Sequence, residues 1–340
     1  MSNQNGFVDV KHVGRTLELF GNGGVIEVRA LKCQQGRAKI PVVSGVFDDV
    51  KKATAAVVDL EKKYRPAGVY IVMNTLDPAC LARSNNRLRE GPEVTASDAD
   101  IEWLRWLLVD LDPVRKRGVS ATKREKKAAD KLASKLVGWF KEQGWPKPIH
   151  ADSGNGVHLA CPIDLDNTAE NTNLLKAVLA ALDRRFSTER VKVDTTTYNP
   201  SRICKLWGTT ARKGESTQDR PHRLSRLLSP ARRRNPVPRE KLEAVAGLAG
   251  TARASATNNS STGHRLDVAR WLGGQGVEFT TKVEKGRVKY LLKVRPIHPD
   301  HGGTPPAIFQ DDDGKLGAKC FHDRASSTTS ICSPPIWMPT

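Results

Sequence analysis

The stretch "RWLLVDLDPVR", Arg105–Arg115, places an apolar run directly before two aspartates, Asp110 and Asp112. The run predicts a buried strand, and Pro113 predicts its end, because proline lacks the N–H that a sheet ladder requires. Residues i and i+2 of a strand share a face, so the two carboxylates would lie about 6.6 Å apart. That spacing suits one divalent cation or two cations about 3.5–4 Å apart. The alternative is an ordinary strand that runs into a turn at Asp112.

A third carboxylate, Asp194, ends another predicted strand, "RVKVD", over residues 190–194. If this strand neighbours the first, Asp110, Asp112 and Asp194 converge on one sheet edge. Three carboxylates provide the oxygen ligands that Mg²⁺ or Mn²⁺ prefers. An isolated acid at a strand end, which is common, remains the alternative.

A glycine-rich segment, "DSGNGVHL", lies between these strands in the chain. Its glycines permit a tight turn, so we expect backbone N–H groups and polar side chains to approach a phosphate. The four turn residues are Ser153, Gly154, Asn155 and Gly156. His158 follows in an apolar strand, on a defined face. A structural histidine is the alternative, but the acidic strand ends on either side favour a functional one.

A basic segment, "NPSRICKLWGTTARKG", follows Asp194. Four cations lie within twelve residues: Arg202, Lys205, Arg212 and Lys213. Positive groups beside a metal site neutralise a triphosphate and the charge that develops during phosphoryl transfer. A basic solvated loop is the alternative interpretation.

The amino-acid composition and net charge of the chain indicate which class of partner it binds. The chain has 340 residues, with 55 Lys and Arg against 37 Asp and Glu, and a formal net charge of +18. This balance favours a polyanion, with nucleic acid ahead of an anionic membrane. No apolar run approaches the roughly 18 residues of a membrane span, and no signal peptide is evident. Six cysteines without a CxxC pair predict reduced thiols and a cytoplasmic location, in a bacterial cell or the host cell of a mobile element.

Periodicity predicts interleaved strands and helices up to about residue 210, with no phosphate-loop motif of a motor ATPase. We expect strands over 23–31, 38–47, 68–74 and 101–112, and a hairpin over 148–164. We expect helices over 47–64, 77–88, 120–144, 167–186 and 239–250. Ser120 or Thr122 would cap the third of these helices, and Gly144 would end it.

Taken in order, "LLVDLD", "SGNGVHL" and "VKVD" resemble the three motifs of the archaeo-eukaryotic primase superfamily, and the basic segment resembles its phage- and plasmid-type primase-polymerase branch. The resemblance covers roughly residues 20–230. It implies an α+β fold with an RRM-like catalytic sheet and an N-terminal α/β module. We therefore expect a catalytic domain over 1–235, divided near residue 100, then a helix and flexible linker over 236–262.

The resemblance implies template-directed nucleotidyl transfer with two Mg²⁺ or Mn²⁺ ions, in replication of a phage, plasmid or other mobile element. Asp110, Asp112 and Asp194 would hold the metals, and the turn residues, His158, Arg202 and Lys205 would hold an NTP or dNTP. A single-stranded DNA template and its primer would contact Arg212, Lys213, Arg220, Arg223 and Arg226. A replicative helicase is an expected partner. A two-metal nuclease and a non-catalytic DNA-binding replication-initiation protein remain the alternatives.

The C-terminal part, residues 263–325, resembles the small zinc module that follows such domains. Candidate ligands are His298, His301, Cys320 and His322. Tetrahedral zinc takes four N or S ligands, but Arg295 and Ala325 occupy two of the expected cysteine positions, so we expect a module that packs without metal.

Residues 326–340 have no periodic pattern and are predicted to be unstructured. Codons for Cys-Gln-Gln-His-His-Phe-Asp-Leu, read one nucleotide out of frame, give "ASSTTSIC", which begins at Ala325. We therefore hypothesise a shortened form of a longer protein. A gene without an open frame one base away would contradict this hypothesis.

Overall fold

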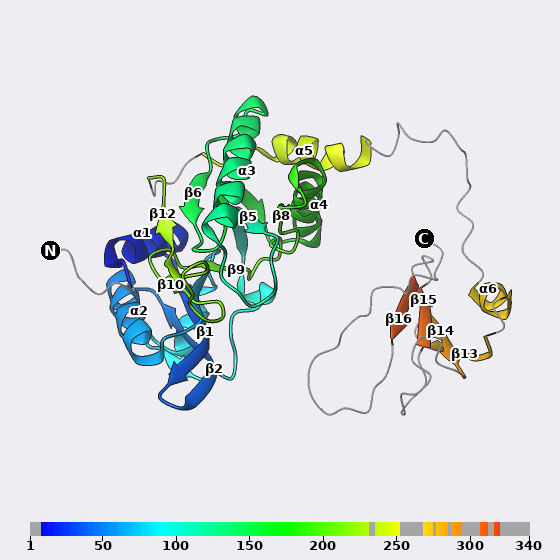
Figure 1. Ribbon diagram of the computed structural model, residues 1–340, viewed down its shortest axis with the longest axis horizontal. Helices are drawn as coiled ribbons and strands as arrows, with labels where there is room; N and C mark the ends of the chain where they lie inside the picture. Colours follow the sequence, from blue (N-terminus) through cyan, green and yellow to red (C-terminus); the bar gives the residue numbers. More distant parts are fainter. Residues whose placement is uncertain are drawn as a thin grey trace. The chain divides into compact units, whose positions relative to one another are not determined.

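The computed structural model describes residues 8–230, 235–251, 268–274, 277–284, 287–293, 307–311 and 316–319. The chain divides into two units, Met1–Thr257 and Asn258–Thr340. Both are built from helices and antiparallel sheets, so the protein is of mixed α+β class (Figure 1). Among the helices that the structure describes, none is long and apolar enough to cross a membrane.

The first sheet of unit 1 has the order β4-β2-β1-β3-β9, with every pair antiparallel. Its strands are β1 (Ile26–Gln35), β2 (Ala38–Phe47), β3 (Gly68–Val72), β4 (Arg89–Glu90) and β9 (Ile203–Lys205). Two helices, α1 (Val10–Gly21) and α2 (Val50–Tyr64), share a hydrophobic core with it. Because β9 comes from far along the chain, the predicted division near residue 100 is not a clean boundary: the later segment completes the earlier sheet.

The second sheet has the order β12-β6-β7-β5-β8 and is also antiparallel. Its strands are β5 (Trp103–Pro113), β6 (Ile149–Asp152), β7 (Val157–Asp166), β8 (Val191–Val193) and β12 (Arg226–Leu227). The predicted hairpin is confirmed as β6 and β7. The predicted strand at the opening stretch is β5, which lies between β7 and β8 and ends at Pro113.

Both faces of β5 are buried, which explains its continuous apolar run. Leu107, Val109 and Leu111 face a core shared with three helices, α3 (Lys123–Glu142), α4 (Ala169–Phe186) and α5 (Arg239–Thr251). Trp106 and Leu108 face the other core, which contains the first sheet and α1. Alternation along the strand therefore places Asp110 and Asp112 on the face toward the first sheet.

Helix boundaries follow their capping residues. The side chain of Thr122 accepts from the Glu125 N–H, and the Glu125 side chain accepts from the Thr122 N–H, so a reciprocal capping box begins α3. Gly144 follows the helix with φ +69°, the left-handed conformation expected at a helix end. Helix α1 was not predicted. Helix α5 was assigned to the linker region, but Val237, Leu242 and Val245 pack in the core of unit 1, so it belongs to that unit.

The remaining elements of unit 1 are short. Two 3-10 helices span Pro78–Arg83 and Asp98–Asp100. A two-stranded sheet pairs β10 (Thr210–Ala211) with β11 (Arg223–Leu224). Four cysteines of this unit (Cys33, Cys80, Cys161 and Cys204) are free and buried, as expected for reduced thiols.

Unit 2 contains α6 (Val268–Gly274) and an antiparallel sheet of β13 (Phe279–Glu284), β14 (Arg287–Leu292), β15 (Ala307–Asp311) and β16 (Leu316–Lys319). Val268 and Leu272 of the helix pack with Tyr290, Leu292 and Ile308 of the strands. The four candidate zinc ligands, most of the predicted linker and the predicted tail lie outside the described residues.

Candidate functional site

The second sheet brings the three predicted carboxylates to one cavity. β8 pairs with β5, with Leu111 opposite Val193, so the predicted neighbouring of the two strands is confirmed. The Asp194 N–H then donates to the Asp110 carbonyl at 2.9 Å. Asp110, Asp112 and Asp194 all line a cavity of about 440 Å³, which Asp183 and Lys192 also border.

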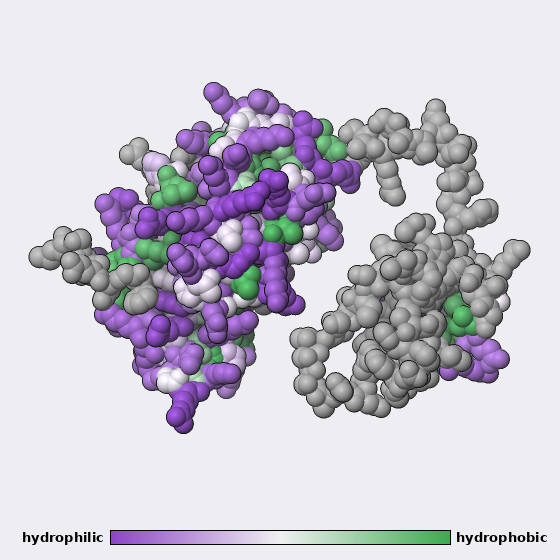
Figure 2. Space-filling view, in the orientation of Figure 1, coloured by the Kyte–Doolittle hydropathy of each residue, from purple (hydrophilic) through white to green (hydrophobic). Residues whose placement is uncertain are grey.

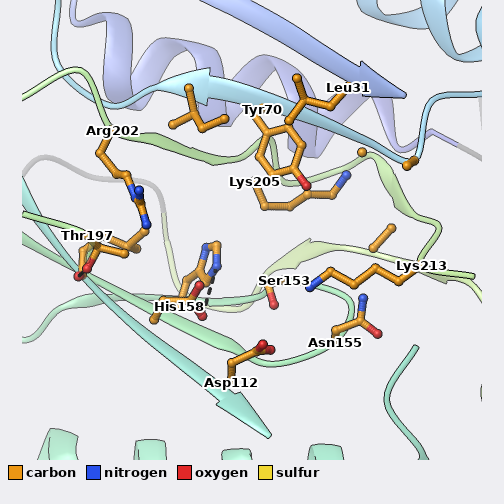
Figure 3. A pocket seen from close by; sticks show the side chains of 16 residues that line it. Leu31, Tyr70, Asp112, Ser153, Asn155, His158, Thr197, Arg202, Lys205 and Lys213 are labelled. Carbon is orange, nitrogen blue, oxygen red and sulfur yellow. Dashed lines mark hydrogen bonds and ion pairs between the residues drawn. The ribbon is translucent and has the colours of Figure 1, made fainter. Parts of the chain in front are cut away.

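Asp110 and Asp112 also border a second cavity, of about 330 Å³, which side chains from both sheets enclose. The first sheet contributes Leu31, Tyr70 and Lys205, and the hairpin contributes Ser153, Asn155 and His158. In Figure 3, Arg202 and Lys213 point from opposite sides into the space above Asp112 and His158. Carboxylates and cations thus face one another across one cavity.

His158 lies opposite Asp110 in the β5–β7 register, and its Nε2 lies 3.5 Å from Asp110 Oδ1. On the other side of the ring, the Trp207 Nε1–H donates to His158 Nδ1 at 3.2 Å. Cys204 Sγ is 3.4 Å from the same nitrogen. With only 4% of its surface exposed, the ring is held by one contact at Nε2 and two at Nδ1.

Burial and neighbouring groups shift the pKa of His158 in opposite directions. Burial alone would lower its pKa, but the Asp110 carboxylate, together with Cys204, raises the pKa to about 10. The indole N–H can only donate, so it favours the form with an unprotonated Nδ1. Nε2 carries a proton both in this neutral form and in the charged imidazolium, and the Nε2–H is directed toward Asp110. Burial would likewise raise the pKa of Asp110, but His158 holds it below the ordinary value.

Trp207 and Tyr70 were not predicted as site residues. Trp207 is fully buried in "KLWGTT", and an apolar residue in a basic segment could have drawn attention to it. Tyr70 reaches the cavity from β3, with the Lys205 amine 5.7 Å from its ring centroid. No local pattern marks Tyr70, because only the packing of the two sheets brings it to Asp110.

The glycine turn differs from the expected phosphate cradle. The Gly154 N–H donates to Asp152 Oδ1 at 2.7 Å, and the Gly156 N–H donates to Ser153 Oγ at 2.9 Å. Asn155 Oδ1 accepts from the Ala121 N–H at 2.8 Å. These groups hold the turn and the segment before α3 in place, so the N–H groups of the two glycines already have acceptors within the protein.

Gly156 is required by close approach rather than by φ. A Cβ at this position would lie 2.3 Å from the Leu111 carbonyl oxygen, a backbone atom of β5.

We expect Gly156→Ala to lower the free energy of unfolding by about 2–3 kcal/mol, because the hairpin must move away from β5. Urea unfolding measures the change. Gly138→Ala is the matched control: no atom lies within 4 Å of its Cβ, and alanine in an exposed helix should stabilise by about 0.5–1 kcal/mol. Equal effects would contradict the argument.

The predicted cations divide into two groups. Arg202, Lys205 and Lys213 line the cavity, so Lys213, which was expected on the nucleic-acid track, lies with the nucleotide group. Arg202 is 3.5 Å from Asp194 and donates to Thr196 Oγ1.

Three other arginines of the expected nucleic-acid track have partners within the fold. Arg212 contacts the Glu61 carboxylate and donates to the Pro66 carbonyl. Arg220 makes a bidentate salt bridge with Glu125. Arg223 donates to the Ala121 carbonyl. Their guanidinium groups organise loops around the cavity. Arg226 is exposed on β12.

A buried charge network supports the cavity from the first sheet. Glu61 of α2 is 2% exposed, and its Oε2 lies 2.7 Å from Arg212 Nη1. Lys205, 5% exposed, donates to Thr209 Oγ1 and to the Thr210 carbonyl. Burial raises the pKa of Glu61 against the effect of Arg212. Burial also lowers the pKa of Lys205 to about 7, although Glu61 opposes the shift.

The donor set fits hard divalent cations. Carboxylate oxygens are the ligands that Mg²⁺ and Mn²⁺ prefer, and three carboxylates border the 440 Å³ cavity. Each also has a positive neighbour: His158 for Asp110, Arg115 for Asp112 and Arg202 for Asp194. In the part of the chain that the structure describes, no three His, Cys, Asp or Glu side chains are grouped closely enough to hold a metal ion.

Comparisons with known proteins give no relative: no protein-family model matches the chain, and a search of curated proteins finds no match.

Proposed function

We propose that this protein is a template-directed nucleotidyltransferase that begins or extends DNA strands with two divalent cations, on a primase-polymerase type of fold. The observation that carries the proposal is the cavity in which Asp110 and Asp112 face Arg202, Lys205 and Lys213. A nucleoside triphosphate with its metal ions has the complementary charge pattern, with phosphates for the cations and ions for the carboxylates. A bare phosphodiester has less use for three cations and a buried histidine.

In this proposal the acidic residues of the site bind the metal ions and the basic residues bind the phosphates. Asp110, Asp112 and Asp194 would hold the cations, which supply charge neutralisation and align the attacking and leaving oxygens. Arg202 and Lys213 would bind phosphate oxygens, since both point into the cavity (Figure 3). The two ring nitrogens of His158 face Asp110 and Trp207, so His158 would position the Asp110 carboxylate beside the phosphates. Positioning and neutralisation are what phosphoryl transfer requires of a protein, without a protein nucleophile.

The direct test is synthesis on a single-stranded DNA template without a primer. The full chain is incubated with labelled NTPs and dNTPs in separate reactions, with Mg²⁺ or Mn²⁺, and a primed template runs in parallel. Elongated products in any of these reactions are expected. Degradation without synthesis would instead identify a nuclease, and DNA binding without either reaction would identify a non-catalytic module.

The amine of Lys205 makes nucleotide affinity depend on pH. Its pKa is lowered to about 7 by burial, so the amine is charged below pH 7 and neutral above it. Triphosphate binding uses the charged form, so we expect affinity to fall by up to about tenfold per pH unit above 7. Anisotropy of a fluorescent nucleoside triphosphate between pH 6 and 9 measures this. Lys205→Met should have a flatter profile, with only the titration of the ligand itself remaining, and identical profiles would contradict the role of Lys205.

A further inference from the structure

Helix α3 exposes a basic stripe, defined here as Lys123, Lys127, Lys131 and Lys135. All four are exposed, while the opposite face of the helix packs its apolar side chains into the core. Residues four apart in a helix are rotated by about 40°, so the stripe is about 18 Å long and winds through about 120° of the helix surface. Hydrophilic residues cover most of unit 1 on the face seen in Figure 2.

The lysines of the stripe destabilise helix α3. Lysines at i and i+4 repel one another, whereas a glutamate at alternate positions would have paired with them. Lys123 and Arg124 also lie in the first turn, where the helix dipole disfavours cations. Within the described residues, Lys123, Arg124, Lys127 and Lys131 have no ion-pair partner, and Lys135 makes only a cation–π contact, with Phe186.

The stripe starts at the candidate site. Lys126, next to the stripe on α3, pairs with Asp152 at the beginning of the glycine turn. Ser120 Oγ donates to the Lys213 carbonyl, and the Ala121 N–H donates to Asn155. The N-terminal end of α3 is therefore bonded to two segments that line the cavity, and the stripe leads away from it.

We infer that the stripe on α3 is a track for the phosphodiester backbone of the nucleic acid that enters the candidate site. This inference rests on the proposed function, since it assigns the path of the strand to that site. A polyanion supplies counter-charges for the lysines of the stripe, which pair with no carboxylate of the described residues, and contacts to phosphates are independent of base sequence. The track replaces the expected one on Arg212, Arg220 and Arg223, whose guanidinium groups already have partners.

The test is a full-length variant with Lys123→Gln, Lys127→Gln, Lys131→Gln and Lys135→Gln. Anisotropy with a labelled single strand, and separately with a primer–template duplex, measures affinity at several salt concentrations. We expect affinity to fall at least about 30-fold at low salt, and the salt slope to decrease by about 3, because up to four phosphate contacts are lost. A loss confined to one ligand assigns the track to the template strand or to the duplex.

The matched control changes four exposed lysines elsewhere: Lys11, Lys39, Lys51 and Lys62. It removes the same charge, so an equal loss of affinity in this variant would overturn the inference. Unchanged affinity in the α3 variant would also overturn it. Thermal unfolding should be unchanged or shifted upward in the α3 variant, since repulsion is removed.

Failure of the inference is distinguishable from failure of the proposed function. Asp110→Asn should bind DNA normally without transferring nucleotides, whereas the α3 variant should regain transfer at saturating template. If neither variant nor wild type transfers nucleotides while the stripe still binds DNA, the proposed function fails and the track remains.

Discussion

Replacing Asp110 with asparagine is expected to reduce nucleotidyl transfer by about a thousandfold or more. The amide keeps the size of the side chain and an acceptor for His158 Nε2, which lies 3.5 Å from the carboxylate. It removes the charge that a divalent cation needs, and such cations supply several kcal/mol of transition-state stabilisation. Asp112→Asn should have a comparable effect, since both carboxylates border the same cavities. The measurement is the initial rate of labelled nucleotide incorporation on a primed template.

The matched control for this pair is Asp166→Asn, which removes an exposed carboxylate at the end of β7 in the same sheet. Its incorporation rate and its urea unfolding should equal those of the wild type. Asp110→Asn removes the partner of His158, so urea unfolding also confirms that this variant is folded under the assay conditions. Incorporation retained by a variant that lacks both Asp110 and Asp112 would rule out the metal assignment. Loss of the same size in Asp166→Asn would show a general effect of charge.

Replacing Arg212 with methionine is expected to lower the free energy of unfolding by about 3–5 kcal/mol. The Glu61 side chain is fully buried. Its Oε1 accepts from the Thr210 N–H, and its Oε2 lies 2.7 Å from Arg212 Nη1, so the ion pair with Arg212 is the main compensation for its charge. Removing one partner of such a pair leaves an uncompensated buried charge. Urea unfolding of the full chain, followed by tryptophan fluorescence, measures the change.

Two further variants separate this mechanism from a loss of packing. Arg226→Met changes an exposed arginine on β12 and should be neutral within about 0.5 kcal/mol. The double variant Glu61→Gln, Arg212→Met removes the unpaired charge and should recover part of the loss. A double variant less stable than Arg212→Met would show that the arginine acts through its packing alone. A neutral Arg212→Met would return this residue to the candidates for binding nucleic acid.

Much of the secondary structure was predictable because its signals are local. The apolar run before Asp110, the Thr122–Glu125 capping box and the glycines of the hairpin each depend on residues close in the chain. The shared face of Asp110 and Asp112 also follows from strand geometry alone. Helix α1 and the three-residue strand β9 were missed: β9 is too short to show periodicity and forms by pairing with β3.

The sequence by itself determined that two carboxylates share one face of a buried strand, that a third ends a second strand, and that cations follow. Only the tertiary structure decided which cations reach those acids. Arg212 and Lys213 are adjacent, but Arg212 contacts the buried carboxylate of Glu61 and Lys213 lines the cavity. A sequence does not show where a charged side chain points. Its direction depends on the backbone conformation at that residue and on the partners that packing brings within reach. The same packing brings Tyr70 into the cavity that Asp110 borders, 40 residues further along the chain, and brings Trp207 to His158, 49 residues earlier in the chain.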